Sequence, residues 1–455
     1  MVNLTNLLAD LPGGFWQTII GWFADFITSY GWTIIVFTVV LKLVLSPLDF
    51  WQKLSMRKTQ KQQALIQPEL DKIKEKYGNN KEVVNQKTME LYQKNKISPM
   101  GGCLGMLVNL VLTMVIFFTL FGAMNNISQY KVAKEYDGLK AEYVSFYNGE
   151  TTFDIDEENK DKTYLECIDY GKIYYDEHEA EIKETYPEDI SKDRDSFGLY
   201  FGQTCGQLKV ENKFNEIKES WLWIKNIFRP DNYASSFPNY NEFLSSTGSN
   251  IYKVKTVEGT ETQYYYQDIN GNLYEYIEGD TDGNTTRLNQ AKEQGEKDFN
   301  LITLQVRTSY GSWNGYFILV ILAAGSTLLG QLLANAGIKA KNKKGEDVKV
   351  KGNTNLILMI VLPLIMGWFT WNYSSIFAIY IIVNSLMSAL IGYIANLILN
   401  KVDEKKETRA VVSGGNRAVK SEIANMDYRI EKKGKIESII PDKKEKKSKE
   451  KGDNK

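Results

Sequence analysis

The sequence predicts an all-α integral membrane protein with five transmembrane helices, a cytoplasmic helical hairpin and a mixed α/β extracellular insertion. Two observations predict this fold class: apolar windows long enough to cross a bilayer, which takes about 20 residues in a helix, and a sorting of charge between them. The windows are Gly31–Leu48, Met100–Ala123, Tyr316–Ala336, Asn355–Trp371 and Ser374–Leu399. The first contains a single charged residue, Lys42, and the other four contain none.

Charge orients the predicted spans. Residues 124–312 hold 20 Lys/Arg against 35 Asp/Glu, whereas 11 Lys/Arg lie in 49–98, 6 in 337–353 and 17 in 400–455. Basic loops stay on the cytoplasmic side of a plasma membrane, so we expect the acidic segment and the N-terminus outside and the C-terminus in the cytoplasm. Chance clustering is the alternative, and the presence on one side of all 34 basic loop residues outside the acidic segment argues against it.

The elements follow in order along the chain. They are an outer interfacial amphipathic helix (1–30), the first transmembrane helix (31–48), the cytoplasmic helical hairpin (49–98), the second transmembrane helix (99–123), an extracellular acidic domain (124–312), the third transmembrane helix (313–336), a cytoplasmic loop (337–353), the fourth and fifth transmembrane helices (354–399) and a basic cytoplasmic tail (400–455).

Helical periodicity supports the amphipathic helix and the hairpin. Within Phe15–Tyr30, apolar residues recur on one face, which we expect to lie on the outer membrane surface; they are Trp16, Ile19, Ile20, Phe23, Phe26, Ile27 and Tyr30. The first hairpin arm carries a stripe of Ile66, Leu70, Ile73 and Tyr77. The turn is predicted at Gly78-Asn79-Asn80, with Asn79 and Glu82 as a capping box that opens a second arm ending near Lys96.

Three features stand out in the acidic segment. Trp221–Phe228 is typical of a second interfacial patch. Gln263–Ile277 alternates around Asn270-Gly271, which predicts a β-hairpin. Cys167 and Cys205 lie where oxidation is possible, and the sequence leaves open whether they form a disulfide.

Lys42 is the most informative residue. It lies 11 residues past Gly31, about 16 Å along a helix, and charged residues at that depth face a partner or a water-filled cavity. No Asp or Glu falls inside the five windows, so we expect a hydrated groove rather than an ion pair. The other groove residues are expected among polar positions of the spans, where ordinary interhelical hydrogen bonds are the alternative. They are Asn109, Thr113, Gln331, Asn335, Tyr380, Asn384 and Ser385.

A groove with one fixed positive charge suggests protein insertion. It can attract an acidic polar segment that must cross the bilayer, while the apolar flank of the substrate moves sideways into lipid. We expect no enzyme activity and no cofactor or metal, since the sequence has no P-loop pattern and a single histidine, His178.

Several stretches resemble the YidC/Oxa1/Alb3 family of membrane protein insertases. The opening VVLKLVLSPLDF with the following QPEL is similar to the start of the family core, and SPMGGCLGMLVNLVLTMVIFFTLF to its second core helix. WLWIKNI resembles its external motif, and LPLIMGWFT and FAIYIIVNSL its last two spans. The chain departs from the family pattern in three ways. Lys42 stands where the family usually has arginine, Gly105 replaces a common proline, and Tyr380-Ile381 replaces a Tyr-Trp pair.

The resemblance implies that this protein inserts nascent membrane proteins and helps them fold, alone or beside the Sec translocon. The basic tail is expected to contact anionic membrane lipids or the ribosome. Two other interpretations remain: a small-solute channel or transporter that uses the charged cavity, and a structural protein whose outer domain binds a surface partner. Reconstitution in liposomes would separate all three.

Overall fold

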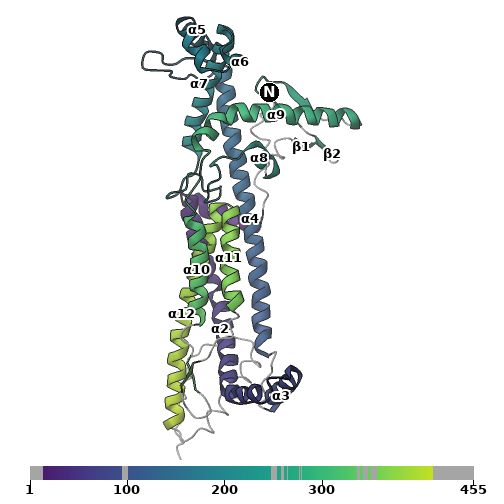
Figure 1. The fold of residues 1–455 in the computed structure, drawn as a ribbon, viewed down its shortest axis with the longest axis vertical. Coiled ribbons are helices and arrows are strands. Elements are labelled where there is room, and N and C mark those ends of the chain that lie inside the picture. Colours follow the sequence, from purple (N-terminus) through teal and green to yellow (C-terminus); the bar gives the residue numbers. More distant parts are fainter. Residues whose placement is uncertain are drawn as a thin grey trace, which may run out of the picture. The chain divides into compact units, whose positions relative to one another are not determined.

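The computed structural model describes residues 14–94, 101–246, 254–257, 261–263, 265–275, 277, 279–335, 339–341, 347–349 and 356–412 (Figure 1). The helices of this described part are α1 (Phe15–Phe26), α2 (Tyr30–Tyr77), α3 (Lys81–Lys94), α4 (Gly101–Tyr147), α5 (Tyr164–Thr185), α6 (Glu188–Ser191), α7 (Arg194–Ile217), α8 (Tyr240–Ser246), α9 (Thr281–Tyr310), α10 (Ile318–Asn335), α11 (Leu356–Asn372) and α12 (Ser375–Val412). The chain forms two units, Met1–Ile394 and Ala395–Lys455, whose boundary lies within α12.

Apolar helices make this a multi-pass membrane protein. Three of them are long and apolar enough to cross a bilayer: Tyr30–Leu54, Val111–Tyr147 and Ser375–Val402. Two shorter apolar helices, Ile318–Leu333 and Met359–Asn372, lie at the third and fourth predicted spans, and α10 packs along α11 (Figure 1). Within the described residues three predicted spans are therefore confirmed by length, and the total of five stays a prediction.

Helix α2 does not stop where the first predicted span ends. It continues through Leu48 to Tyr77 and packs against α3 through a separate small core of Ile66, Leu70 and Leu91. This confirms the helical hairpin. The predicted cap was wrong by one residue, because the Asn80 side chain, rather than that of Asn79, accepts the first free N–H groups of α3.

Helix α4 likewise runs far beyond its apolar window. Its first half is apolar as far as Ala123, and its second half carries Lys131, Glu135 and Lys140. The second half packs against α7 and α9. The predicted second span and the acidic segment are therefore joined by one unbroken helix, which fixes part of that segment to a span.

The acidic segment is mainly helical in the described residues. Antiparallel α5 and α7 form its most extensive helix pair, and α5 opens with a capping box between Thr163 and Glu166. The predicted hairpin around Asn270-Gly271 is confirmed by β3 (Tyr265–Gln267) and β4 (Leu273–Glu275), which pair antiparallel. Gly271 adopts a φ of 86°, the left-handed conformation that favours glycine in such turns. The remaining strands are β1 (Val254–Val257), β2 (Glu261–Gln263), β5 (Lys339–Lys341) and β6 (Asp347–Lys349).

One main hydrophobic core links the spans to the acidic segment. It joins Ile34 of α2, Leu120 of α4, Phe299 of α9 and Phe377 of α12. Helix α1 packs on α2 and α4 through Ile20, so part of the apolar face that was expected to lie on the membrane surface is covered by these two helices. That helix ends earlier than predicted, however. Its partly or fully buried core contacts are Trp16, Ile19, Ile20 and Phe23, while Phe26 is exposed and Tyr30 already belongs to α2.

Candidate functional site

Lys42 has an ion-pair partner that sequence analysis excluded. Its Nζ lies 3.6 Å from Oδ2 of Asp49, and the two side chains are 12% and 28% exposed. The expectation of an unpaired lysine was wrong because Asp49 lies one residue past the window Gly31–Leu48. Since α2 continues without a break, the residue seven positions on comes round to the same face after two turns.

The other expected groove residues occupy different environments. Tyr380 is buried in the main core and its ring stacks on Phe377, with centroids 6.2 Å apart. Asn384 and Gln331 are half-buried, and Thr113 on α4 is exposed. The side chains of Asn109 and Asn335 lie outside the described part of the chain.

Ser385 takes part in a polar contact between two apolar helices. Its Oγ lies 3.4 Å from Oγ1 of Thr327, which joins α12 to α10. Thr327 was missed by sequence analysis. A Cβ added at Gly330, one turn further along α10, would lie 3.5 Å from the Ser385 carbonyl oxygen, so the two helices approach closely here. Small residues at such contacts are typical of spans that pack in a membrane.

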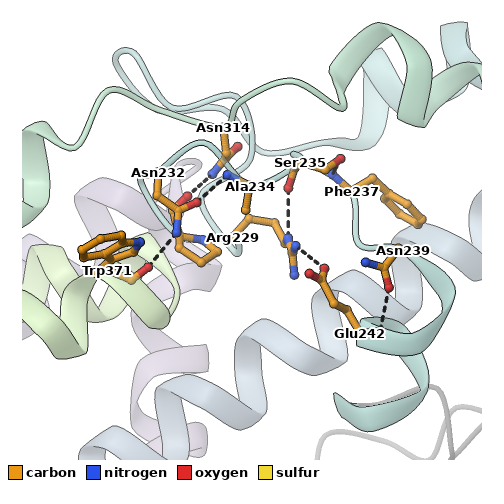
Figure 2. Close-up of polar contacts among 10 residues, drawn as sticks. Arg229, Asn232, Ala234, Ser235, Phe237, Asn239, Glu242, Asn314 and Trp371 are labelled. Carbon is orange, nitrogen blue, oxygen red and sulfur yellow. Dashed lines mark hydrogen bonds and ion pairs between the residues drawn. The ribbon is translucent and has the colours of Figure 1, made fainter.

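A second polar site lies at the ends of the apolar helices next to the acidic segment. Residues Glu219–Asn232, here called the cap segment, bind the ends of α10, α11 and α12. A carboxylate oxygen of Asp231 accepts the backbone N–H of Leu319 at 2.6 Å, and the Arg229 carbonyl accepts the N–H of Ser375 at 3.0 Å and its hydroxyl at 2.7 Å. The Asn232 amide donates to the Trp371 carbonyl at 2.7 Å (Figure 2).

The cap segment also contacts the two spans that precede it in sequence. The carboxylate of Glu219 accepts the backbone N–H of Tyr30, at the start of α2. Burial raises the pKa of Glu219 above its ordinary value of 4.5, although that N–H and nearby Lys131 oppose the shift. On α4, the buried carboxylate of Glu135 accepts a hydrogen bond of 2.9 Å from the amide of Asn226.

Asn314 holds the cap segment in shape. Its Oδ1 accepts the N–H of Asn226 at 2.8 Å, and its Nδ2 donates to the carbonyls of Asn226 and Pro230 at 2.8 and 2.9 Å. Arg229 bonds the Ser235 carbonyl and the Glu242 carboxylate in the same region (Figure 2). Asn314 is fully buried, and leaving such a group unsatisfied costs about 1–3 kcal/mol.

The predicted interfacial patch Trp221–Phe228 is largely an interior element. Ile224, Ile227 and Phe228 are buried in the main core, whereas Leu222 is 67% exposed. The prediction was wrong for most of the patch because its apolar residues cover the span ends instead of facing lipid. Sequence analysis also passed over the adjoining Asp231 and Asn232. Two polar residues directly after Pro230 were the available signal, since Asp and Asn are preferred where helices begin and chains turn.

The two outer cysteines are buried together between α5 and α7. They belong to one small cluster and both are free thiols. A hydrogen bond with the Cys167 thiol, together with burial, raises the pKa of Cys205. The helices approach closely because Gly171 and Gly202 lie at the contact; a Cβ on either would lie 2.5–2.6 Å from the other helix's side chains. The structure brings the predicted pair together, and its oxidation stays a prediction.

Comparison with known proteins bears on the first part of the chain. A family profile described as "60Kd inner membrane protein" matches residues 22–157, from the end of α1 through α4. Curated relatives include the membrane protein insertase YidC of Fusobacterium nucleatum, 44% identical over 101 residues, which are 22% of this chain and 45% of that protein. This part of the chain is similar to the YidC/Oxa1 family.

Other YidC relatives match over similar lengths. The protein of Leptospira interrogans is 42% identical over 100 residues, covering 22% of this chain and 15% of the relative. That of Geobacter metallireducens is 39% identical over 102 residues, covering 22% and 18%. The chain thus spans less than half the length of these curated relatives. No solved structure matches it.

Proposed function

We propose that this chain is a membrane protein insertase and chaperone of the plasma membrane. The relatives named above are YidC insertases. The observation that carries the proposal is Lys42, a mostly buried cation within the first apolar window whose partner, Asp49, lies at the window's end. Placing a charge at such depth costs free energy and is typical of residues that act on a substrate or ion.

The ion pair modifies the mechanism expected from the sequence. Lys42 and Asp49 are neutral as a pair, so the resting site costs less than a lone cation would. An acidic segment of a substrate competes with Asp49 for the Lys42 ammonium. When it displaces Asp49, the polar segment is held inside the membrane while its apolar flank moves into lipid. Asp49 is then the counter-ion that the substrate replaces.

The remaining groove residues, the topology and the partners belong to the same proposal. We assign the polar wall to Asn109, Thr113, Gln331, Asn335, Asn384 and Ser385, whereas Tyr380, also expected there, is buried in the main core. The N-terminus lies outside and the basic tail in the cytoplasm, as the charges of the loops indicate. Nascent membrane proteins are the substrates. Membrane lipids, the ribosome and the Sec translocon are the expected partners.

Substitutions at the ion pair test this function. In liposomes containing purified protein, we measure insertion of a single-span substrate with an acidic translocated tail. Lys42→Arg retains the charge and should retain insertion, whereas Lys42→Ala and Lys42→Glu should slow it by about tenfold or more, because charges close together at reduced dielectric attract by several kcal/mol. Asp49→Asn should insert this substrate at least as fast as the wild type, since the competing anion is gone.

A substrate with a neutral tail is the matched control, and all four variants should insert it at similar rates. Undiminished insertion of the acidic tail by Lys42→Glu would contradict the mechanism. Passage of a small solute through the liposomes with no inserted substrate would point to a channel instead.

A further inference from the structure

Five spanning or apolar helices meet one short stretch of chain at the same end. The cap segment bonds the first residues of α2, α10 and α12, the last residues of α11, and Glu135 of α4. Asp231, Asn226 and Asn314 are completely buried, and Asn232 is 8% exposed. Water hardly reaches these side chains, so their polar groups depend on hydrogen bonds within the protein.

We propose that Asp231, Asn232 and Asn314 are positioning residues that lock the ends of α10, α11 and α12 together and close the space between these helices from that side. The proposal rests on the proposed insertase function for its purpose, since a groove for insertion must not leak across the membrane. Its test needs no substrate, so the two can fail separately.

Directional bonding is needed at this place for a physical reason. Apolar helices in lipid gain nothing from the hydrophobic effect when they pack together, so polar contacts and close fit must set their arrangement. Helix ends offer unpaired N–H and C=O groups for this purpose. Asp231 takes an N–H of α10, Asn232 gives its amide to a C=O of α11, and Arg229 offers its own carbonyl to α12. Three helices are thus bound through one loop.

Asn314 makes that loop rigid enough to act as a lock. It follows α9 and precedes α10, yet it bonds the cap segment on both sides of Ile227 through Asn226 and Pro230. The backbone N–H groups of Asn314 and Gly315 both donate to the Asn232 carbonyl, at 3.0 and 3.1 Å. Asn314→Asp keeps the shape of the side chain and its acceptor oxygen. It replaces the Nδ2 group, which donates two hydrogen bonds, by an oxygen that faces the carbonyl oxygens of Asn226 and Pro230.

The test reads access to a buried position from each side of the membrane. Ala378, one turn into α12, is completely buried; Ala378→Cys is made in a chain with Cys103→Ser, Cys167→Ser and Cys205→Ser. A charged, membrane-impermeant maleimide is applied to membrane vesicles of both orientations. Asn314→Asp and Asp231→Ala should raise labelling from the cap-segment side by about tenfold, as expected when buried hydrogen bonds are lost. Labelling from the opposite side should change less than twofold.

Asn239→Ala is the matched control. Asn239 lies in the same region and caps α8 by accepting the N–H of Glu242, but it does not take part in the contacts with the span ends (Figure 2). It should leave labelling unchanged. If Asn314→Asp does not fold, Asn232→Asp decides, because it loses the bond to Trp371 and keeps the Oδ1 bond to the N–H of Ala234.

Two outcomes would overturn the lock. One is unchanged labelling from the cap-segment side in folded Asp231→Ala and Asn232→Asp variants. The other is an equal rise from both sides, which would show general loosening rather than a lock. If the variants are labelled faster from the cap-segment side only, but the wild type inserts no substrate, the lock is supported and the insertase function is wrong.

Discussion

Gly31→Ala offers a sensitive test of how the cap segment meets α2. Gly31 is the second residue of that helix, and a Cβ there would lie 2.4–2.5 Å from three atoms of the Trp221 indole. Ordinary contacts are 3.4–4 Å, so the methyl group overlaps the ring by about 1 Å. The ring has little freedom to retreat. It packs edge-on against Trp32, and its backbone is paired with Ile224 in both directions.

The expected cost follows from two opposing effects. Overpacking of this kind destabilises by about 1–3 kcal/mol, and the better helix propensity of alanine returns at most about 1 kcal/mol. Gly31→Ala should therefore lower the free energy of unfolding by about 1–2 kcal/mol. Gly122→Ala, on α4, is the control, because no atom lies within 4 Å of its added Cβ. It should stabilise by up to about 1 kcal/mol.

Thermal unfolding of the purified protein in detergent, followed by tryptophan fluorescence, provides the assay. The two glycine substitutions should shift the midpoint in opposite directions. Adding Trp221→Leu to Gly31→Ala should recover part of the loss, since the ring that clashes is gone, and the double-mutant cycle gives the coupling. Equal shifts for both glycine variants, or no coupling with Trp221, would refute the close contact.

Three further predictions concern other parts of the chain. Burial raises the folded-state pKa of Glu219 above 4.5, so its contribution to stability is full below pH 4.5 and is lost as the pH rises through the folded-state pKa. The unfolding midpoint of Glu219→Gln should therefore vary less with pH above 4.5 than that of the wild type. Parallel pH profiles of the two midpoints would contradict this. Oxidation should join Cys167 to Cys205 and stabilise α5–α7 by roughly 4 kcal/mol, seen as a reductant-dependent midpoint, while thiols that label readily without reductant would show that no bond forms. Removing the residues after Val402 should weaken cosedimentation with ribosomes at low salt. Unchanged cosedimentation would show that the tail contacts lipid and not the ribosome.

Local patterns in the sequence predicted the local structure well. The apolar windows, the hairpin stripe of Ile66 and Leu70, and the β-turn at Asn270-Gly271 all depend on residues a few positions apart. Such periodicity and turn chemistry can be read without knowledge of the fold. The predicted ends of the helices were less accurate, and the most important error came from the end of the first span. Ending the first span at Leu48 placed Asp49 outside it and made Lys42 seem unpaired.

Contacts between distant residues were beyond the reach of these patterns. Asp231 and Leu319 are 88 positions apart, Asn232 and Trp371 139, and Arg229 and Ser375 146. Nothing near Asp231 in the sequence indicates which helix end it caps, because capping requires only a carboxylate beside free N–H groups. The apolar residues of Trp221–Phe228 suit a membrane surface and a buried core equally well, and only the fold distinguishes the two.

The distribution of polar groups links the two sites. The cap segment gathers buried polar side chains at the span ends and pairs them with free backbone groups there, where helix ends must be satisfied in any case. Lys42 does not share this arrangement, because it lies within a continuous helix whose own backbone is already bonded. Lys42 caps no helix end, and its burial is costly unless an anion is close by. Asp49 reduces this free-energy cost. A leucine at position 42 would need no such partner, and this cost is the reason we propose that Lys42 binds a negatively charged segment in place of Asp49.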